Sequence, residues 1–302
     1  MTIYQIAFYN VSRKKAKKGE QISAILLSHE DYLILSSKVK CMEISNFLYG
    51  GKKNGKHYFF KSYKCVMEEW EGYYFPELLI TYFEDEMGKK IVFAENDKKL
   101  FQFMRRLLRS EFLYPELIKN GYMPLHGACV IKNNRAIAFL GESGAGKTSA
   151  MLPLIEYLGY DLISSDLLFV SKEGHVVGTP EKMRITPVTL KQYSPKYDFL
   201  INSTEKITFS PSFFSLVFGC NIVSDARLDT IILPKINVDG KENKLVREYS
   251  QLDLREYISP FIYDYQSGES ILWSGNVYQL EYNGDVKRLM ELYKNNEVTN
   301  EI

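Results

Sequence analysis

The 302-residue sequence has few cysteines, little net charge and no long apolar run, and each absence argues against a class of protein. Its 4 cysteines stand far apart without CxxC spacing, which disfavours a zinc site or a dense disulfide framework and fits a reducing cytosol. A net charge of +1 argues against nucleic-acid binding driven by overall charge. No apolar stretch approaches the roughly 18 residues that span a bilayer, and residues 1–10 lack the regions of a signal peptide. We therefore expect a cytoplasmic protein with no nucleic-acid or membrane partner.

Apolar and aromatic residues, by contrast, are plentiful. The hydrophobic fraction is 45% and the charged fraction 25%, values typical of a globular protein, and 22 tyrosines and 18 phenylalanines predict a sizeable aromatic core. The basic run Arg13–Lys18 is most simply a solvated loop before Gly19, and the alternative is a contact with an acidic partner.

Residues 141–148, GESGAGKT, fit the G-x-x-x-x-G-K-[ST] pattern of a phosphate-binding P-loop. Glycines let successive backbone N–H groups point inward at an anion, and the following helix adds the positive end of its dipole. Lys147 is expected to reach the β- and γ-phosphates, and the Thr148 hydroxyl to ligate Mg²⁺. Segment 135–140 is typical of a buried strand and 148–158 of a helix, whereas the alternative, a glycine-rich turn with a surface lysine, needs neither.

The chain divides by composition into a smaller domain, residues 1–112, and a P-loop domain, residues 113–302. The first is β-rich and ends in a linking helix from Asn96 to about Asn120, which Pro115 is expected to kink or split. Its expected strands are Ile22–Leu27, Tyr32–Leu35, His57–Phe60, Leu78–Phe83 and Lys90–Phe93, and its expected turns are Gly50–Gly51, Asn54–Gly55 and Met87–Gly88. It contains no recognisable catalytic constellation.

The segment around the P-loop has the clearest pattern. Residues 124–131 and 136–140 are expected to form a hairpin about Lys132–Arg135, so the strand that feeds the loop would pair antiparallel with the strand before it. A further strand is expected to end in Asp166, and a second hairpin to turn at Lys172–Gly174.

Other features of the second domain are expected from local pattern. Pro153 predicts a kink in the helix after the loop, because it removes a backbone hydrogen bond there. The apolar runs 213–218 and 230–234 are expected in the core, and residues 285–293 are expected to form a closing amphipathic helix.

Three blocks in this segment resemble the HPr kinase/phosphorylase group, which shares its fold with phosphoenolpyruvate carboxykinase. They are Leu125–Val130 (LHGACV), Phe139–Thr148 (FLGESGAGKT) and Leu162–Asp166 (LISSD), within residues 120–185. The resemblance implies an α/β fold, in which a carboxykinase-like mixed-sheet P-loop domain is preceded by a smaller β-rich α+β N-terminal domain. Members of the group act as kinases on a serine hydroxyl of a protein or peptide. More distant relatives phosphorylate free serine or the C-terminal serine of lasso-peptide precursors.

The resemblance also implies roles for particular residues. Thr148 and Asp166 would hold Mg²⁺, directly or through water. His126, Lys147 and Asp166 would form the catalytic centre, and the alternative for His126 is a core histidine that fixes the hairpin. The residues that hold the phosphates of ATP would be Gly141, Glu142, Ser143, Gly144, Ala145, Gly146, Lys147, Thr148 and Ser149.

Ser165 departs from the family pattern. It stands where the family has the aspartate that takes the proton from the attacking hydroxyl, and serine cannot act as that base at neutral pH without help. Two consequences are open. Either Asp166 or His126 substitutes as the base, because phosphoryl transfer depends chiefly on positioning and charge neutralisation, or catalysis has been lost and the protein binds nucleotide as a regulator.

Ser165 and Arg184 are candidate substrate residues. Arg184 lies in the stretch Gly178–Thr186, whose beginning resembles the G-x-P stretch of many relatives. Its guanidinium could clamp a phosphate or a substrate carboxylate, and the alternative is a surface arginine at the start of a strand.

The sequence thus predicts an ATP-dependent kinase that transfers the γ-phosphate to a serine-like hydroxyl of a peptide, protein or small molecule. The alternative is a nucleotide-binding, non-catalytic partner protein in a peptide-modification pathway. A simple ATPase or GTPase comes third, because the expected hairpin disagrees with a parallel sheet at the P-loop and no water-positioning residue is recognisable. Relatives often form homo-oligomers, which the residues of this chain leave open.

Overall fold

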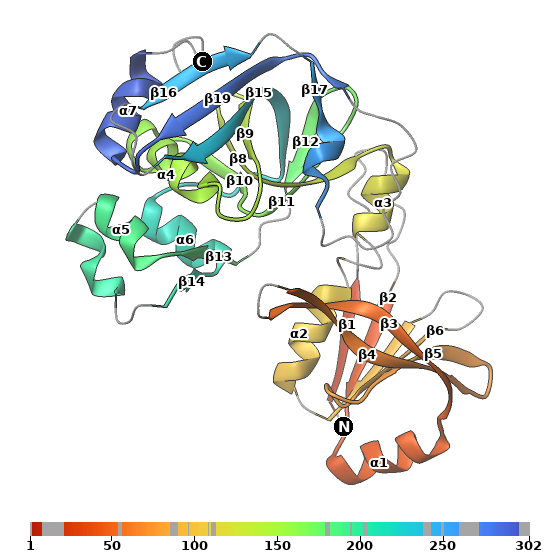
Figure 1. Ribbon diagram of the computed structural model, residues 1–302. Coiled ribbons are helices and arrows are strands. Elements are labelled where there is room, and N and C mark those ends of the chain that lie inside the picture. Colours follow the sequence, from red (N-terminus) through yellow and green to blue (C-terminus); the bar gives the residue numbers. More distant parts are fainter. Residues whose placement is uncertain are drawn as a thin grey trace. The chain divides into compact units, whose positions relative to one another are not determined.

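The computed structural model shows two compact units, Met1–Glu116 and Leu117–Ile302 (Figure 1). The sequence-based boundary between residues 112 and 113 lies a few positions before this division, which falls inside helix α3 (Tyr114–Lys119). The residues that the structure describes are 2–7, 21–53, 56–84, 90–95, 97–107, 109, 113–178, 182–193, 195–201, 205–237, 243–248, 251–259 and 272–295.

The first unit is built on a 7-stranded sheet with the strand order β1-β2-β7-β6-β5-β4-β3. Every neighbouring pair is antiparallel except β2 and β7, which run parallel. The elements of this unit are β1 (Thr2–Ala7), β2 (Gln21–Leu26), α1 (His29–Lys38), β3 (Lys40–Lys53), β4 (Lys56–Met67), β5 (Trp70–Phe75), β6 (Ile80–Glu84), β7 (Lys90–Ala94) and α2 (Asp97–Leu107), with α3 at the division.

The core of the first unit lies between its sheet and helix α2. The apolar stripe of α2 places Leu100, Phe103, Met104 and Leu107 against alternate residues of the strands, because a helix shows one face every third or fourth residue and a strand every second. The rings of Phe75 and Phe103 meet edge to face with centroids 5.0 Å apart.

Two sequence-based expectations for this unit are wrong. Tyr32–Leu35 was expected as a strand and lies in helix α1, because Ser28 caps that helix: its hydroxyl oxygen accepts a hydrogen bond from the Asp31 backbone N–H at 3.1 Å. Gly50–Gly51 was expected as a turn and lies inside strand β3, at a shift of register beside Tyr49 that is typical of a β-bulge.

Other expectations for the first unit meet the structure differently. The single helix expected from Asn96 to Asn120 is two helices, α2 and α3, and Pro115 is the second residue of α3, where the first turn tolerates a missing N–H. The basic run Arg13–Lys18 and the expected turns Asn54–Gly55 and Met87–Gly88 lie outside the described residues.

The second unit holds an 8-stranded mixed sheet and two small two-stranded sheets, β13–β14 and β17–β18. Its elements are β8 (Met123–Lys132), β9 (Arg135–Leu140), α4 (Lys147–Leu158), β10 (Asp161–Ser164), β11 (Leu167–Val170), β12 (His175–Gly178), β13 (Met183–Ile185), α5 (Pro187–Tyr193), η2 (Pro195–Leu200), β14 (Ile207–Phe209), α6 (Pro211–Phe218), β15 (Asp225–Ile236), β16 (Lys244–Glu248), β17 (Leu252–Asp253), η3 (Leu254–Tyr257), β18 (Leu272–Trp273), β19 (Asn276–Tyr282) and α7 (Val286–Asn295).

Strand pairing in the large sheet closes on itself. Strand β8 pairs with β9 on one side and with β11 on the other, β11 continues to β12 and β15, and β15 returns to β9. The P-loop strand β9 therefore has an antiparallel neighbour, β8, and a parallel neighbour, β15. The expected hairpins β8–β9 and β11–β12 are confirmed, and the sheet around the loop is mixed.

Each face of this sheet carries its own core. Along β9, Ala136, Ala138 and Leu140 join one core with residues of β11 and β12, while Ile137 and Phe139 join the other with α4 and α7. This alternation follows from the two-residue period of a strand. Helix α4 therefore packs against the strand that leads into it. This packing fixes the position of the P-loop, which connects the two elements.

Other expectations for the second unit are corrected. The strand expected to end in Asp166 ends at Ser164, so Ser165 and Asp166 lie in the bend before β11. Helix α4 runs without interruption through Pro153. The run 213–218 is helix α6, in which Phe214 and Phe218 are buried but Leu216 is 80% exposed, because one face of a helix cannot bury every residue of a continuous run.

Two further expectations for this unit are confirmed. Residues 230–234 lie in the buried strand β15, and the closing helix is α7, whose Val286, Leu289 and Tyr293 are buried. Among the described residues, no helix has the length and apolarity needed to cross a membrane.

Candidate functional site

Strand register brings three sequence-predicted segments to one edge of the sheet. Gly127 of β8 lies opposite Leu140, the last residue before the P-loop, and His126 lies opposite Leu167, which follows Asp166. The N–H of Gly127 also donates to the carbonyl oxygen of Asp166 at 3.1 Å. The dipeptide His126–Gly127 therefore stands between the start of the loop and the bend that carries Asp166.

Gly127 is required by the packing of these strands. A Cβ atom built on it would lie 2.6 Å from side-chain carbons of both Leu140 and Leu168. No real contact is that short, so any larger residue would push β9 or β11 away from β8.

The P-loop leads directly into helix α4. Gly146 is the N-cap of the helix with φ 96° and ψ 15°, a left-handed conformation that glycine adopts without strain. Gly141 and Gly144 also have positive φ, and Glu142, Ser143 and Gly144 are exposed. The first N–H groups of a helix have no partner inside it, so this turn presents donors at the positive end of the helix dipole.

Lys147 is a buried cation at that turn. The residue is 7% exposed, and its ammonium group donates hydrogen bonds to the carbonyl oxygens of Gly141 at 2.7 Å and Glu142 at 2.9 Å. Burial lowers the pKa of Lys147, and the negative charge of Asp166 acts on it in the opposite direction. The ammonium thus folds over the loop, within electrostatic reach of the Asp166 carboxylate.

The side chains of Asp166 and His126 are in hydrogen-bonding contact beside the loop. The Nε2 atom of His126 lies 3.2 Å from Oδ1 of Asp166, and because an ionised carboxylate only accepts, Nε2 is the donor. The histidine side chain is 16% exposed and the aspartate side chain 48% exposed. The imidazole therefore orients a carboxylate that keeps much of its surface available.

Ser165 has a different environment. It is 9% exposed, and its hydroxyl oxygen finds no hydrogen-bond partner in the part of the chain that the structure describes. The neighbouring Ser164 is satisfied, since its hydroxyl donates to the carbonyl oxygen of Leu167. A buried polar group without a partner is costly, which makes the Ser165 hydroxyl a group that a ligand could satisfy.

The oxygen atoms near the loop suit a hard cation. Mg²⁺ binds through one or two carboxylates, with substrate phosphates and water completing the octahedron. Asp166 offers a half-exposed carboxylate, and Thr148, the second residue of α4, offers a partly buried hydroxyl. Among the described residues, no three histidine, cysteine or acidic side chains lie close enough together to hold a metal ion.

Two tyrosines that sequence reasoning missed bind the start of α4. The hydroxyl of Tyr282, the last residue of β19, donates to the carbonyl oxygen of Gly146 at 2.9 Å, and Tyr293 of α7 donates to Ala150 at 2.9 Å. Both are more than 130 positions away from their acceptors in the sequence, with separations of 136 and 143, and no local motif announces such a contact.

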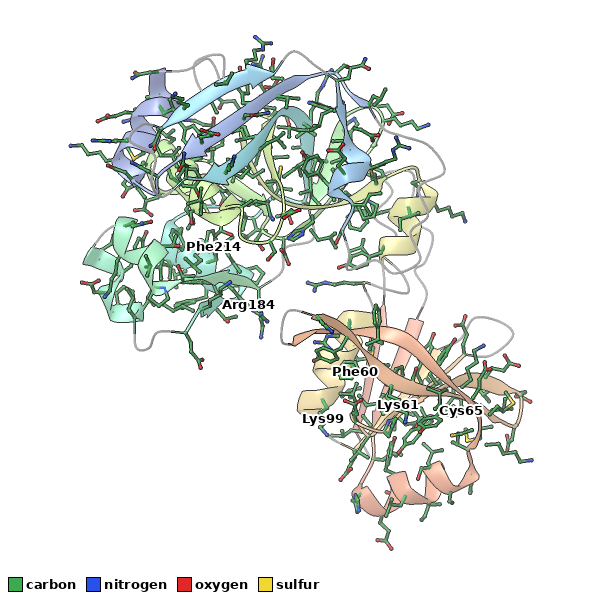
Figure 2. All side chains as sticks on the ribbon, in the orientation of Figure 1. Phe60, Lys61, Cys65, Lys99, Arg184 and Phe214 are labelled. Atoms are coloured by element: carbon green, nitrogen blue, oxygen red, sulfur yellow. The ribbon has the colours of Figure 1, made fainter. Side chains whose placement is uncertain are left out.

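Two further candidate residues, Ser149 and Arg184, have neighbours outside the loop itself. The Ser149 hydroxyl is 3.4 Å from that of Thr189 in α5, so it faces a neighbouring helix. Arg184 is exposed on the small β13–β14 sheet, which packs against the helix α6 that carries Phe214 (Figure 2). No contact in the described part of the chain brings Arg184 to Lys147 or Asp166.

Comparison with known proteins gives likenesses at the level of structure alone. No family model and no curated protein matches the chain. The chain is similar to the solved structure of the Hpr(Ser) kinase/phosphatase from Coxiella burnetii, with 16% identity and a TM-score of 0.31 over 59% of this chain and 99% of that one. A likeness of this size leaves the function to be argued from the residues of the site.

Proposed function

We propose that the protein is an ATP-dependent phosphotransferase that delivers the γ-phosphate to a hydroxyl group of a peptide, protein or small molecule. The observation that carries the proposal is Lys147, a buried ammonium folded over a glycine-rich turn at the N-terminus of α4. A buried cation needs charged or polar partners, and the loop carbonyls that it now contacts are neutral. The phosphates of a nucleotide would supply the negative charge.

Asp166 is proposed as the base. The acceptor oxygen would attack the γ-phosphorus, the bond from that phosphorus to ADP would break, and the hydroxyl proton would pass to the Asp166 carboxylate. The hydrogen bond from His126 holds this carboxylate, and the N–H of Gly127 holds the backbone carbonyl of the same residue. Mg²⁺, held by Thr148 and reached by Asp166 through a coordinated water so that the carboxylate stays free to accept the proton, would neutralise phosphate charge, which is the largest requirement of phosphoryl transfer. Holding the acceptor beside the phosphate supplies much of the remainder.

Ser165 is proposed to contact the acceptor. Its buried hydroxyl has no partner among the described residues and adjoins the proposed base, so it can bind a polar group of the acceptor beside the reacting hydroxyl. The exposed Arg184 is not part of this arrangement.

A second candidate function is nucleotide binding without catalysis, as a regulatory or partner protein. Ser165 favours it, because this residue stands where the related kinases carry their base, and a hydroxyl does not abstract a proton at neutral pH. The two candidates differ in turnover and share the nucleotide site.

Incubation with γ-labelled ATP, Mg²⁺ and hydroxyl-bearing acceptors tests the proposal. We expect phosphotransfer by the wild-type protein that disappears in Lys147→Met and in Asp166→Asn. Tight ATP binding without transfer to any acceptor would support the second candidate instead. Transfer gained only in Ser165→Asp would show that the wild-type chain lost catalysis through this residue.

A further inference from the structure

We infer that Tyr282 positions the phosphate-binding amide of Lys147 through the carbonyl group of Gly146. The inference rests on the proposed nucleotide site and concerns a residue from the far end of the chain. Strand β15 runs parallel to both β9 and β19. The P-loop, which follows β9, and Tyr282, the last residue of β19, therefore lie at the same end of the sheet.

The geometry of one peptide group connects the two residues. The Gly146 carbonyl and the Lys147 N–H belong to the same planar unit and point in opposite directions. The carbonyl oxygen accepts from Ala150 N–H at 2.9 Å and from the Tyr282 hydroxyl at 2.9 Å. Holding the oxygen toward the helix body therefore aims the N–H out of the helix terminus, where an anion binds.

Tyr282 also closes the space beside Gly146. The tyrosine is 2% exposed, and a Cβ atom on Gly146 would lie 2.2 Å from its hydroxyl oxygen. Only glycine fits at this position, for two reasons. Its backbone is left-handed, and a side chain would collide with the Tyr282 hydroxyl.

A chain of hydroxyl groups leads to this bond. Thr186 and Thr189 are 2.8 Å apart at their hydroxyl oxygens, Thr189 and Ser149 are 3.4 Å apart, and Ser149 in turn hydrogen-bonds Tyr282. Each hydroxyl that donates onward can accept from the one before it, and such chains strengthen their members. Helix α5 thereby supports the orientation of the loop amide.

The experiment compares Tyr282→Phe with Tyr293→Phe by equilibrium titration with ATP and Mg²⁺. Both variants remove one buried hydroxyl that donates to a carbonyl of α4, at Gly146 and at Ala150, one turn apart. We expect Tyr282→Phe to weaken ATP binding about fivefold to tenfold and Tyr293→Phe to leave it within about twofold, with similar losses of thermal stability in both.

Three results would decide against the inference. If Tyr282→Phe and Tyr293→Phe weaken ATP binding equally, the role of Tyr282 is structural. If neither changes affinity while Lys147→Met abolishes it, the nucleotide site stands and the positioning role falls. If the wild-type protein does not bind ATP, the proposed function falls with it.

A second inference concerns the first unit and stands independently of nucleotide binding. The structure assigns Cys41 and Cys65 as a pair able to form a reversible disulfide between strands β3 and β4. They are direct partners in the antiparallel register, so their side chains lie on the same face of the sheet. Directly opposed residues have Cα atoms roughly 4.5–5.5 Å apart, within the range that a disulfide requires.

The two thiols differ in access. Cys41 is exposed on the edge strand β3, whereas Cys65, labelled in Figure 2, is buried. Burial raises the pKa of both thiols, that of Cys65 to about 12, so the exposed Cys41 is the thiol that would react first. With glutathione disulfide as the oxidant, Cys41 forms a mixed disulfide and Cys65 displaces glutathione. The two protein thiols lose two electrons and two protons, and the glutathione disulfide gains them as two thiols.

Mass spectrometry of the native protein after incubation with glutathione disulfide tests this pair. We expect a linked peptide that contains Cys41 and Cys65, a mass loss of two hydrogen atoms, and full reversal by a dithiol. Cys129 and Cys220, which are buried without a facing cysteine, should stay reduced as internal controls. Stable glutathionylation of Cys41 without the link, or no reaction at Cys41, would overturn the assignment.

Discussion

A pair of buried hydroxyl groups in the first unit differs in its hydrogen bonding from the buried polar groups beside the P-loop in the second. In the first unit, the buried Tyr32 and Thr81 hydroxyls lie 3.2 Å apart and satisfy one another. In the second, the buried ammonium of Lys147 has only loop carbonyls, and the Ser165 hydroxyl has no partner in the described part of the chain. The Tyr32–Thr81 pair thus stabilises the first unit, whereas Lys147 and Ser165 place polar groups beside the P-loop that a ligand could satisfy.

Asp166→Asn should produce the largest change. We expect phosphotransfer to fall about 10²- to 10⁴-fold, as for loss of a general base, with little change in thermal stability because the side chain is half exposed. The assay is the initial rate of label transfer at saturating ATP.

Asp161→Asn is the matched control at the other end of β10. One carboxylate oxygen accepts from the backbone N–H of Asn221 at 2.8 Å and the other from its side-chain amide at 3.2 Å. The variant would set a second donor against that amide, so it should lower stability and leave transfer intact. Equal losses of phosphotransfer in Asp161→Asn and Asp166→Asn would contradict a specific catalytic role for Asp166.

Phe103→Ala should destabilise the first unit by about 3–5 kcal/mol, because it removes a fully buried ring that packs against Phe75. Denaturant unfolding measures the loss, and Phe103→Leu, which keeps most of the volume, should cost less than about 1.5 kcal/mol. ATP binding should persist in both variants, since every residue of the proposed site belongs to the second unit. Loss of binding in the folded Phe103→Leu variant would contradict this division of roles.

Lys147→Met should raise the stability of the ligand-free protein at neutral pH. Burial lowers the pKa of Lys147 below its unfolded value of 10.5, so the charged form is disfavoured in the folded state. Below the lowered pKa, the buried charge reduces the free energy of unfolding of the wild type by its full amount. This loss becomes smaller as the pH rises toward 10.5, because the folded chain has by then released the proton that the unfolded chain still binds.

Thermal unfolding of wild type and Lys147→Met between neutral and alkaline pH measures this effect. The difference between the two melting temperatures should narrow as pH rises. A variant less stable than wild type at neutral pH would mean that the loop carbonyls fully satisfy the ammonium.

Tyr32→Phe should have the smallest effect, about 1 kcal/mol of stability, because it leaves the Thr81 hydroxyl without its partner. Thr81→Val combined with Tyr32→Phe replaces both polar groups and should recover part of the loss. Chemical denaturation measures the free energy of unfolding of the single and double variants. If the double variant loses more than the two single variants lose together, the two hydroxyl groups do not satisfy one another.

Local chemistry made the P-loop region predictable. The hairpin β8–β9, the loop and helix α4 follow from turn residues, a glycine-rich motif and helical spacing that lie next to one another in the sequence. Helix α1 was missed although Ser28 and Asp31 form the S-x-x-D signature of a helix start, because the apolar residues after them were interpreted as a strand.

Long-range contacts could not be predicted in the same way. Tyr282 reaches Gly146 only because β19 pairs parallel to β15 and β15 to β9, which no local pattern specifies. The facing of Cys41 and Cys65 depends likewise on the register of β3 and β4, and their separation in the sequence hid it. Both contacts depend on which strands pair and in which register, and neither can be read from the residue types alone.

Calorimetric titration with ATP and Mg²⁺ tests the central claim, that Lys147 and the loop amides bind nucleotide phosphates. The account predicts saturable binding at one site per chain, a weaker response to ADP, none to adenosine, and a loss of affinity of about 10²-fold or more in Lys147→Met. Equal affinity of ATP for the wild type and for Lys147→Met, or equal binding of adenosine and ATP, would contradict it.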